Sequence, residues 1–186
     1  MDNDWLGIYD IDGIIAQNEK REEKANKFVG NVLRYTKPYL SKKTQEIVEK
    51  EIFYHKDVFY NPEDVARDEA IADVRNHLYT LQNRGWVGWY LTSRPWSLYR
   101  ITAKWLEEHQ MPAASLFCKD EVWKYVRTKD QWKPGVVHTM AVLLRPQKIK
   151  FVDDEEETCK AVLECVSRLG IDIRVYTSLA EAIKEP

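Results

Sequence analysis

The sequence has few of the features that mark secreted, membrane or zinc-binding proteins. It contains three cysteines among 186 residues (Cys118, Cys159 and Cys165), too few and too scattered for a disulfide framework or a zinc site. No apolar run approaches the ~20 residues of a membrane span, and residues 86–91 form one of the longest. The N-terminus is acidic and lacks the basic-then-apolar layout of a secretory signal. We therefore expect a cytoplasmic protein without a membrane partner.

An excess of one charge is also missing. The chain has 28 Lys and Arg against 30 Asp and Glu, a net charge of −2, which argues against binding that rests on net charge alone. With 44% hydrophobic and 31% charged residues, the composition is that of a folded domain and not of a disordered chain. A chain of this length forms one domain, or one domain with a modest insertion.

Short apolar runs alternate with amphipathic segments along the chain. The runs that read as buried strands are residues 5–9, 86–91, 115–118, 149–152 and 171–176. Helical patterns occupy residues 19–53, 61–84, a stretch beginning at Pro95, 134–144 and 155–169. Apolar strands that alternate with helices are typical of a parallel sheet covered on both faces. We therefore predict an α/β protein with a Rossmann-like parallel sheet and helices on both faces.

Polar residues follow three of these strands, and ligands of such sheets bind beyond the carboxyl ends of the strands. The first strand ends in Asp10-Ile-Asp12-Gly13. Carboxylates this close repel each other unless a proton or a cation joins them. Magnesium prefers carboxylate and phosphate oxygens as ligands. The alternative interpretation is an ordinary turn.

The second strand ends in Thr92-Ser93-Arg94-Pro95, where a helix is expected to begin. Hydroxyls and backbone N–H groups at a helix N-terminus bind anions, although such residues also serve as simple N-caps. The guanidinium of Arg94 could fork onto a substrate phosphate, or it could form a local salt bridge. We expect Ser93 and Arg94 to bind substrate.

The fourth strand is followed by a second carboxylate pair, Asp153 and Asp154, and Lys133 opens the preceding helix. Taken alone, the acidic pair could be the first turn of a helix, which the helix dipole favours, and Lys133 could be a surface lysine. The combination is more informative than its parts, because each polar group follows a predicted core strand or precedes one. Together they supply a nucleophile, an acid, a cation and metal ligands.

These residues, in this order, resemble the four motifs of the haloacid dehalogenase (HAD) superfamily of phosphohydrolases. The motifs here are residues 8–13, residues 90–95, Lys133 and residues 151–154, so the resemblance spans nearly the whole chain. Within the superfamily, residues 92–95 followed by 102–106 are similar to small polynucleotide 3′-phosphatase domains. One departure is Ile14, which stands where the family usually has Thr or Val.

The resemblance implies phosphoryl transfer through a covalent aspartyl-phosphate. Asp10 would attack phosphorus, and Asp12 would protonate the leaving oxygen and then activate water. Thr92 and Lys133 would stabilise the equatorial oxygens. The implied Mg2+ ligands are Asp10, the backbone carbonyl of Asp12, Asp153 and Asp154. Lys129 and Lys119 are alternatives to Lys133, which we prefer because it opens a helix just before the last metal-binding strand.

The family places a cap between its first two motifs. We therefore expect residues 1–15 and 61–186 to form the core and residues 16–60 to form a small helical cap insertion. Residues 20–50 carry nine Lys or Arg against four Asp or Glu, which suits either an anionic substrate or a solvated helix face. Residues 119–133 interleave cations with Trp123, Tyr125 and Trp132. Such a mixture suits single-stranded nucleic acid or a nucleotide base, although the aromatic side chains could instead anchor a loop onto the core.

The sequence thus predicts a magnesium-dependent phosphomonoester hydrolase. Its substrate would be a phosphorylated small molecule or, as we favour, a nucleotide or nucleic-acid phosphate end. The alternative is a HAD-fold binding or regulatory module without useful turnover. A receiver-type signalling domain is disfavoured, because such domains lack a helical insertion after the first Asp. The oligomeric state is left open.

Overall fold

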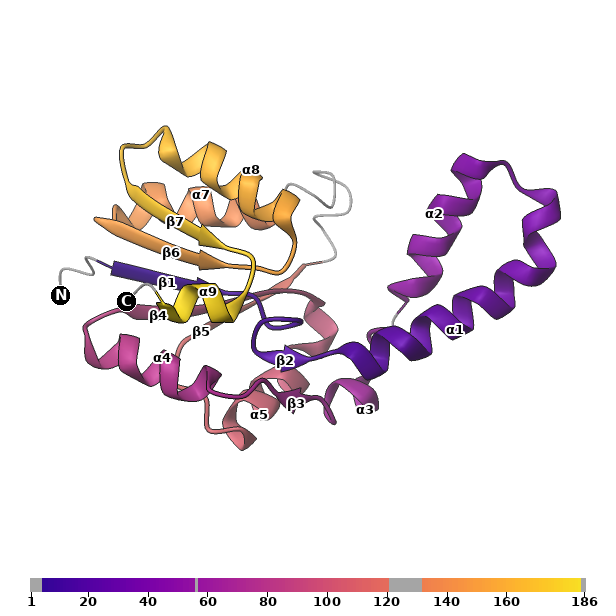
Figure 1. Ribbon diagram of the computed structural model, residues 1–186, viewed down its shortest axis with the longest axis horizontal. Helices are drawn as coiled ribbons and strands as arrows, with labels where there is room; N and C mark the ends of the chain where they lie inside the picture. Colours follow the sequence, from indigo (N-terminus) through magenta and orange to yellow (C-terminus); the bar gives the residue numbers. More distant parts are fainter. Residues whose placement is uncertain (1–4, 56, 121–131, 185–186) are drawn as a thin grey trace. The chain divides into compact units, whose positions relative to one another are not determined.

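The computed structural model describes residues 5–55, 57–120 and 132–184. The chain divides into two compact units (Figure 1): a core unit, residues 1–16 and 70–186, and an inserted unit, residues 17–69. The division falls within two short strands, β2 (Ala16–Gln17) and β3 (Glu69–Ala70), which pair as a two-stranded sheet. The insertion predicted from the sequence ended at residue 60, nine residues before the end of the inserted unit.

The core unit contains a five-stranded parallel sheet in the order β5-β4-β1-β6-β7. Its strands are β1 (Trp5–Tyr9), β4 (Val87–Pro95), β5 (Ser115–Lys119), β6 (Lys148–Val152) and β7 (Asp172–Tyr176). Its helices are α4 (Val74–Asn83), the 3-10 helix η2 (Trp96–Leu98), α5 (Tyr99–Glu108), α7 (Trp132–Leu144), α8 (Glu156–Ser167) and α9 (Leu179–Lys184). The predicted α/β class with a parallel sheet is confirmed.

Helices cover both faces of the sheet (Figure 1). Alternate residues of a strand point to opposite faces, so they pack against different helices. Leu6 and Ile8 of β1 pack into the hydrophobic cluster that α7 and α8 share. Tyr9 belongs instead to the cluster that contains residues of α4, α5 and α9. With both faces buried, the strands are largely apolar. An exception is the buried Lys150 of β6, whose Nζ donates to the Ala182 carbonyl at 3.1 Å. No helix among the described residues is both long enough and apolar enough to span a membrane.

The single helix predicted for residues 61–84 is wrong. The segment forms a short helix α3 (Pro62–Val65), then β3, then α4, whose N-cap residue Asp73 has φ 64°. The apolar spacing already breaks here, because Val65 and Ile71 are six residues apart and cannot share a helix face. The backbone N–H of Ile71 instead donates to the carbonyl of Ile15 at 2.8 Å, which ties this segment to the chain leaving β1.

The inserted unit consists of α1 (Glu19–Thr36), a 3-10 turn η1 (Lys37–Tyr39), α2 (Lys42–Phe53) and α3. The turn at Pro38 divides the span that was predicted as helical, because proline removes a backbone donor and disfavours the helix before it. A buried arginine holds the base of the unit: Arg21 Nε donates to Asp68 Oδ1 at 2.8 Å, and Nη1 donates to the Phe59 carbonyl at 3.0 Å. By contrast, none of the residues 42–53 is buried.

Candidate active site

The acidic residues at the ends of β1 and β6 are brought together by strand register. Tyr9 pairs with Val152 in the parallel sheet. Asp10 and Asp153 are the next residues in each strand direction, so they lie side by side at the same edge of the sheet. One carboxylate oxygen from each of Asp10, Asp153 and Asp154 lies within 4.8 Å of the others. This set matches the carboxylates expected from the sequence to ligate a metal.

Gly13 makes the turn after β1 possible. It has φ 80°, a conformation that residues with a Cβ rarely adopt. A Cβ at this position would also lie 2.8 Å from the Asp154 Cγ and closer still to Oδ2. The chain after β1 therefore passes against the acidic cluster, and only glycine leaves room for the Asp154 carboxylate.

Lys133, in the first turn of α7, contacts two of the three carboxylates. Its Nζ lies 2.7 Å from Asp10 Oδ2 and 2.6 Å from Asp153 Oδ2, and the side chain is buried. Among the three candidate lysines, Lys133 is thus the one seen at the acidic cluster. Lys129 lies outside the described residues, and Lys119 ends β5 and is half-buried.

Burial and mutual repulsion disfavour charge in this cluster. Burial raises the pKa of Asp10 well above its usual value; Lys133 opposes this shift, and Asp153 adds to it. Burial, followed by repulsion from Asp153, raises the pKa of Asp154 to about 6. For Lys133, burial alone would lower the pKa, but Asp10 and Asp153 raise it above the usual value. Additional positive charge would therefore stabilise the ionised carboxylates of this cluster.

Asp12 is engaged by Arg94 and lies outside the acidic cluster. Arg94 Nη2 donates to Asp12 Oδ1 at 2.6 Å, and Nε lies 3.2 and 3.1 Å from Oδ1 and Oδ2. Nη1 of the same guanidinium donates to Thr102 Oγ1 of α5 at 3.4 Å. The sequence left open whether Arg94 pairs with a phosphate or with a neighbouring acid, and in the structure it pairs with Asp12.

Thr92 and Ser93 lie within β4, which extends four residues beyond its predicted end and has an irregular register between Thr92 and Pro95. The Thr92 side chain is buried, and its Oγ1 accepts a hydrogen bond from the Arg94 backbone N–H at 3.2 Å. Ser93 is half-buried. Neither residue caps a helix, because the 3-10 helix that follows has Pro95 as its N-cap.

The aromatic residues expected to stack on a substrate separate into two groups. Trp132 is 3% exposed and belongs to the core cluster shared with α8. It therefore anchors α7 to the core, which was the alternative interpretation. Trp123 and Tyr125 lie outside the described residues.

The donor set fits magnesium. The buried carboxylates of Asp10 and Asp153 and the exposed carboxylate of Asp154 present oxygen atoms to one point, which is the ligand chemistry that Mg2+ requires. Burial and then repulsion from Asp153 raise the pKa values of Asp10 and Asp154, and a divalent cation there would offset both effects. The backbone carbonyl of Asp12 stays a predicted ligand.

Comparison with solved structures gives the fold. The chain is similar to a phosphoserine phosphatase (14% identity, TM-score 0.58, covering 97% of this chain and 98% of that one). It is also similar to a hydrolase from Streptococcus pneumoniae (12% identity, TM-score 0.55, covering 99% and 98%). A third match is a chain of the Pnkp1/Rnl/Hen1 RNA repair complex (14% identity, TM-score 0.55), of which it covers 42%. No family model matches the chain, and no curated protein sequence is significantly similar to it.

The chain has a HAD fold. Within this fold, the residues predicted from the sequence lie where β1, β4 and β6 end, together with the first turn of α7. Sequence reasoning gave Thr102 no role at the site, although residues 102–106 form part of the motif resemblance. The one available signal was a hydroxyl residue among apolar ones at helical spacing; Thr102 is fully buried and contacts Arg94.

Proposed function

We propose that this chain is a magnesium-dependent phosphomonoester hydrolase that works through an aspartyl-phosphate. The observation that carries the proposal is the buried contact between Lys133 and Asp10 beside Asp153 and Asp154. Buried charges are expensive unless they are paired, and such clusters mark functional sites. The HAD fold of its structural neighbours, several of which are phosphatases, supports the same chemistry.

Asp10 is the proposed nucleophile. Its Oδ1 accepts from the backbone N–H of Ile11 at 2.7 Å, which fixes the carboxylate plane, and Lys133 contacts Oδ2. A carboxylate oxygen of Asp10 forms a bond to phosphorus while the bond from phosphorus to the leaving oxygen breaks. When bound, Mg2+ supplies electrostatic stabilisation of the transferring phosphoryl oxygens.

Asp12 is the proposed acid and base. It donates a proton to the leaving oxygen and then accepts one from the water that hydrolyses the aspartyl-phosphate. The fork of Arg94 orients the Asp12 carboxylate. Thr92 and Lys133 are the proposed donors to the phosphoryl oxygens, and Ser93 stays a proposed substrate contact.

The proposed substrate is a nucleotide or nucleic-acid phosphate end. This finer statement is supported by the similarity to a chain of an RNA repair complex and by the motif resemblance of residues 92–106. The cap role expected for the insertion stays a prediction.

Phosphate release from an aryl phosphate tests the chemistry. Wild type should turn over with Mg2+ and stop when a chelator is added, and Asp10→Asn should lose at least about a thousandfold in kcat. Asp172→Asn is the matched control, because Asp172 is exposed at the opposite end of the sheet. A phosphate adduct on the peptide containing Asp10, trapped in Asp12→Asn, would identify the nucleophile.

Two outcomes would contradict the proposal. Turnover that persists in Asp10→Asn would place the nucleophile elsewhere. No turnover of any phosphate ester by folded protein that binds Mg2+ would favour the binding-module alternative.

A further inference from the structure

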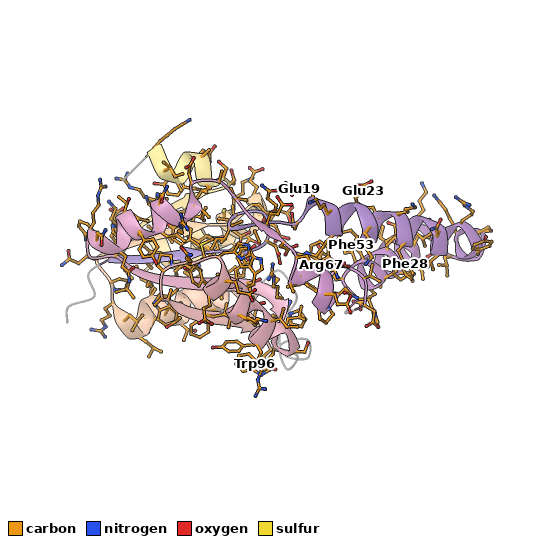
Figure 2. All side chains as sticks on the ribbon, turned by 90° about the horizontal axis from the view of Figure 1, so that it is seen from below. Glu19, Glu23, Phe28, Phe53, Arg67 and Trp96 are labelled. Atoms are coloured by element: carbon orange, nitrogen blue, oxygen red, sulfur yellow. The ribbon has the colours of Figure 1, made fainter. Side chains whose placement is uncertain are left out.

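An exposed tryptophan follows the strand that carries Thr92. β4 ends at Pro95, and Trp96 opens the 3-10 helix that follows. Four residues span at most ~14 Å, so Trp96 lies within reach of a ligand held at Thr92. Its side chain is 56% exposed and projects from the edge of the core unit in Figure 2. The other end of the same turn, Leu98, is buried, which anchors this short segment.

Trp96 is paired with a second ring. The ring centroids of Trp96 and Tyr99 are 4.7 Å apart, and their planes are tilted by 31°. Tyr99 is half-buried at the start of α5, so it fixes one side of the indole. Two aromatic rings held together offer a rigid surface that a further flat ring can join at little entropic cost.

Trp96 is more exposed than the other tryptophans of the described residues, of which Trp5 is 38% exposed. Trp86, Trp105 and Trp132 are at most 4% exposed, as large aromatic side chains commonly are. Single exposed apolar residues need no explanation. A ring pair with one exposed member is a different case, because it holds apolar surface in water directly after the strand that carries Thr92.

Cations accompany the ring pair. Arg100 is exposed in the first turn of α5, and Lys104 lies one turn further along the helix and pairs with Glu108 at an exposed site. An aromatic surface next to basic side chains is the combination that binds single-stranded nucleic acid, whose bases stack and whose phosphates are attracted to the cations. A small phosphate ester without a base would use neither feature.

We propose that Trp96 and Tyr99 form a stacking platform for the base of a single-stranded nucleic-acid end whose terminal phosphate lies at Asp10. This inference rests on the proposed function for the identity of the phosphate site. One nucleotide carries its base and its phosphate on the same sugar, so the terminal nucleotide would contact both the platform and Asp10.

The test compares two oligonucleotides with a 3′-phosphate, one with a normal terminal nucleotide and one whose terminal nucleotide is abasic. In wild type, the ratio of their kcat/KM values should favour the base by about tenfold. Trp96→Ala should reduce this ratio to near one, and Trp96→Phe should restore part of it. Tyr79→Ala, which removes an exposed aromatic side chain on α4, should leave the ratio unchanged.

Equilibrium binding of the same two oligonucleotides, with Mg2+ present, separates this inference from the proposed hydrolase. A base preference that disappears in Trp96→Ala supports the platform even if no phosphate is released. A ratio that is the same in wild type and Trp96→Ala, by turnover or by binding, overturns it. Aryl phosphate turnover with no base preference would refute the platform and leave the hydrolase standing.

Discussion

The buried pair between Arg94 and Asp12 gives the sharpest prediction. The Arg94 side chain is fully buried and that of Asp12 is 13% exposed, and the guanidinium reaches both carboxylate oxygens. Arg94→Met replaces the guanidinium with an apolar group of similar length and removes this ion pair from the Asp12 carboxylate. Breaking a buried ion pair in this way typically costs ~3–5 kcal/mol.

The structure narrows that range. Because Asp12 keeps some contact with water, we expect a loss near the lower limit, about 3 kcal/mol. The free energy of unfolding of a domain is about 5–15 kcal/mol. The variant should therefore remain folded but lose a large part of its unfolding free energy. For a chain of this size the midpoint of thermal unfolding should fall by roughly 6–12 °C.

Arg168→Met is the matched control. Arg168 Nη2 lies 2.6 Å from Glu164 Oε1, the same distance as in the buried pair, but both side chains are 73% exposed. Such a surface pair contributes about 0.5 kcal/mol. Urea unfolding of the two variants at neutral pH measures the difference. Equal losses, or a loss below about 1 kcal/mol in Arg94→Met, would refute the reasoning.

Kinetics of Arg94→Lys then separate the two roles that the sequence left open. Lysine keeps the charge but cannot form the fork. If Arg94 orients Asp12, kcat should fall with KM nearly unchanged. If Arg94 instead binds the substrate phosphate, KM should rise.

Three further predictions follow from other residues. Gly13→Ala should weaken Mg2+ binding at least about tenfold, because the added Cβ would displace Asp154. The control Gly170→Ala, at φ 73° with open space around it, should lose only about 1 kcal/mol of stability. Equal Mg2+ affinities of wild type and Gly13→Ala by calorimetry would contradict this prediction. Mg2+ affinity should fall about tenfold per pH unit below about pH 6, since the pKa of Asp154 is raised to about 6 and its protonated form cannot ligate; a flat pH profile would disprove it. Burial, followed by repulsion from Lys150, lowers the pKa of His77 to about 4. Between about pH 6.5 and pH 4 the unfolded state therefore binds more protons than the folded state. The free energy of unfolding should decrease as the pH falls through this range. His77→Gln should remove about 1–2 kcal/mol of the loss between about pH 7 and pH 5; identical pH profiles of the unfolding free energy in wild type and variant would exclude this role.

The sheet could be predicted from the sequence because its strands are buried on both faces. Such strands are mostly apolar, and the change to Asp10, Thr92 and Asp153 marks where the apolar residues of β1, β4 and β6 give way to the polar residues of the site. The parallel register aligns Tyr9 with Val152, and this alignment brings the carboxylates of Asp10 and Asp153 together.

Other features depend on contacts that no local pattern carries. Asp12 and Arg94 are 82 residues apart, and either could have had several partners. β2 and β3 have two residues each, too few for any periodicity to indicate a strand. The short helix α9 was missed for a similar reason: its six residues cover less than two helical turns.

Charge balance at the site links fold and chemistry. Four carboxylates lie at the ends of β1 and β6, those of Asp10, Asp12, Asp153 and Asp154, and two basic side chains contact them, those of Arg94 and Lys133. Among these described groups the excess is two negative charges, which equals the charge that one Mg2+ would neutralise. Arg94 pairs with the carboxylate of Asp12, so the excess falls on the remaining three carboxylates. Those three are the ones whose oxygens converge, and this is why the cluster fits a divalent cation better than a second lysine.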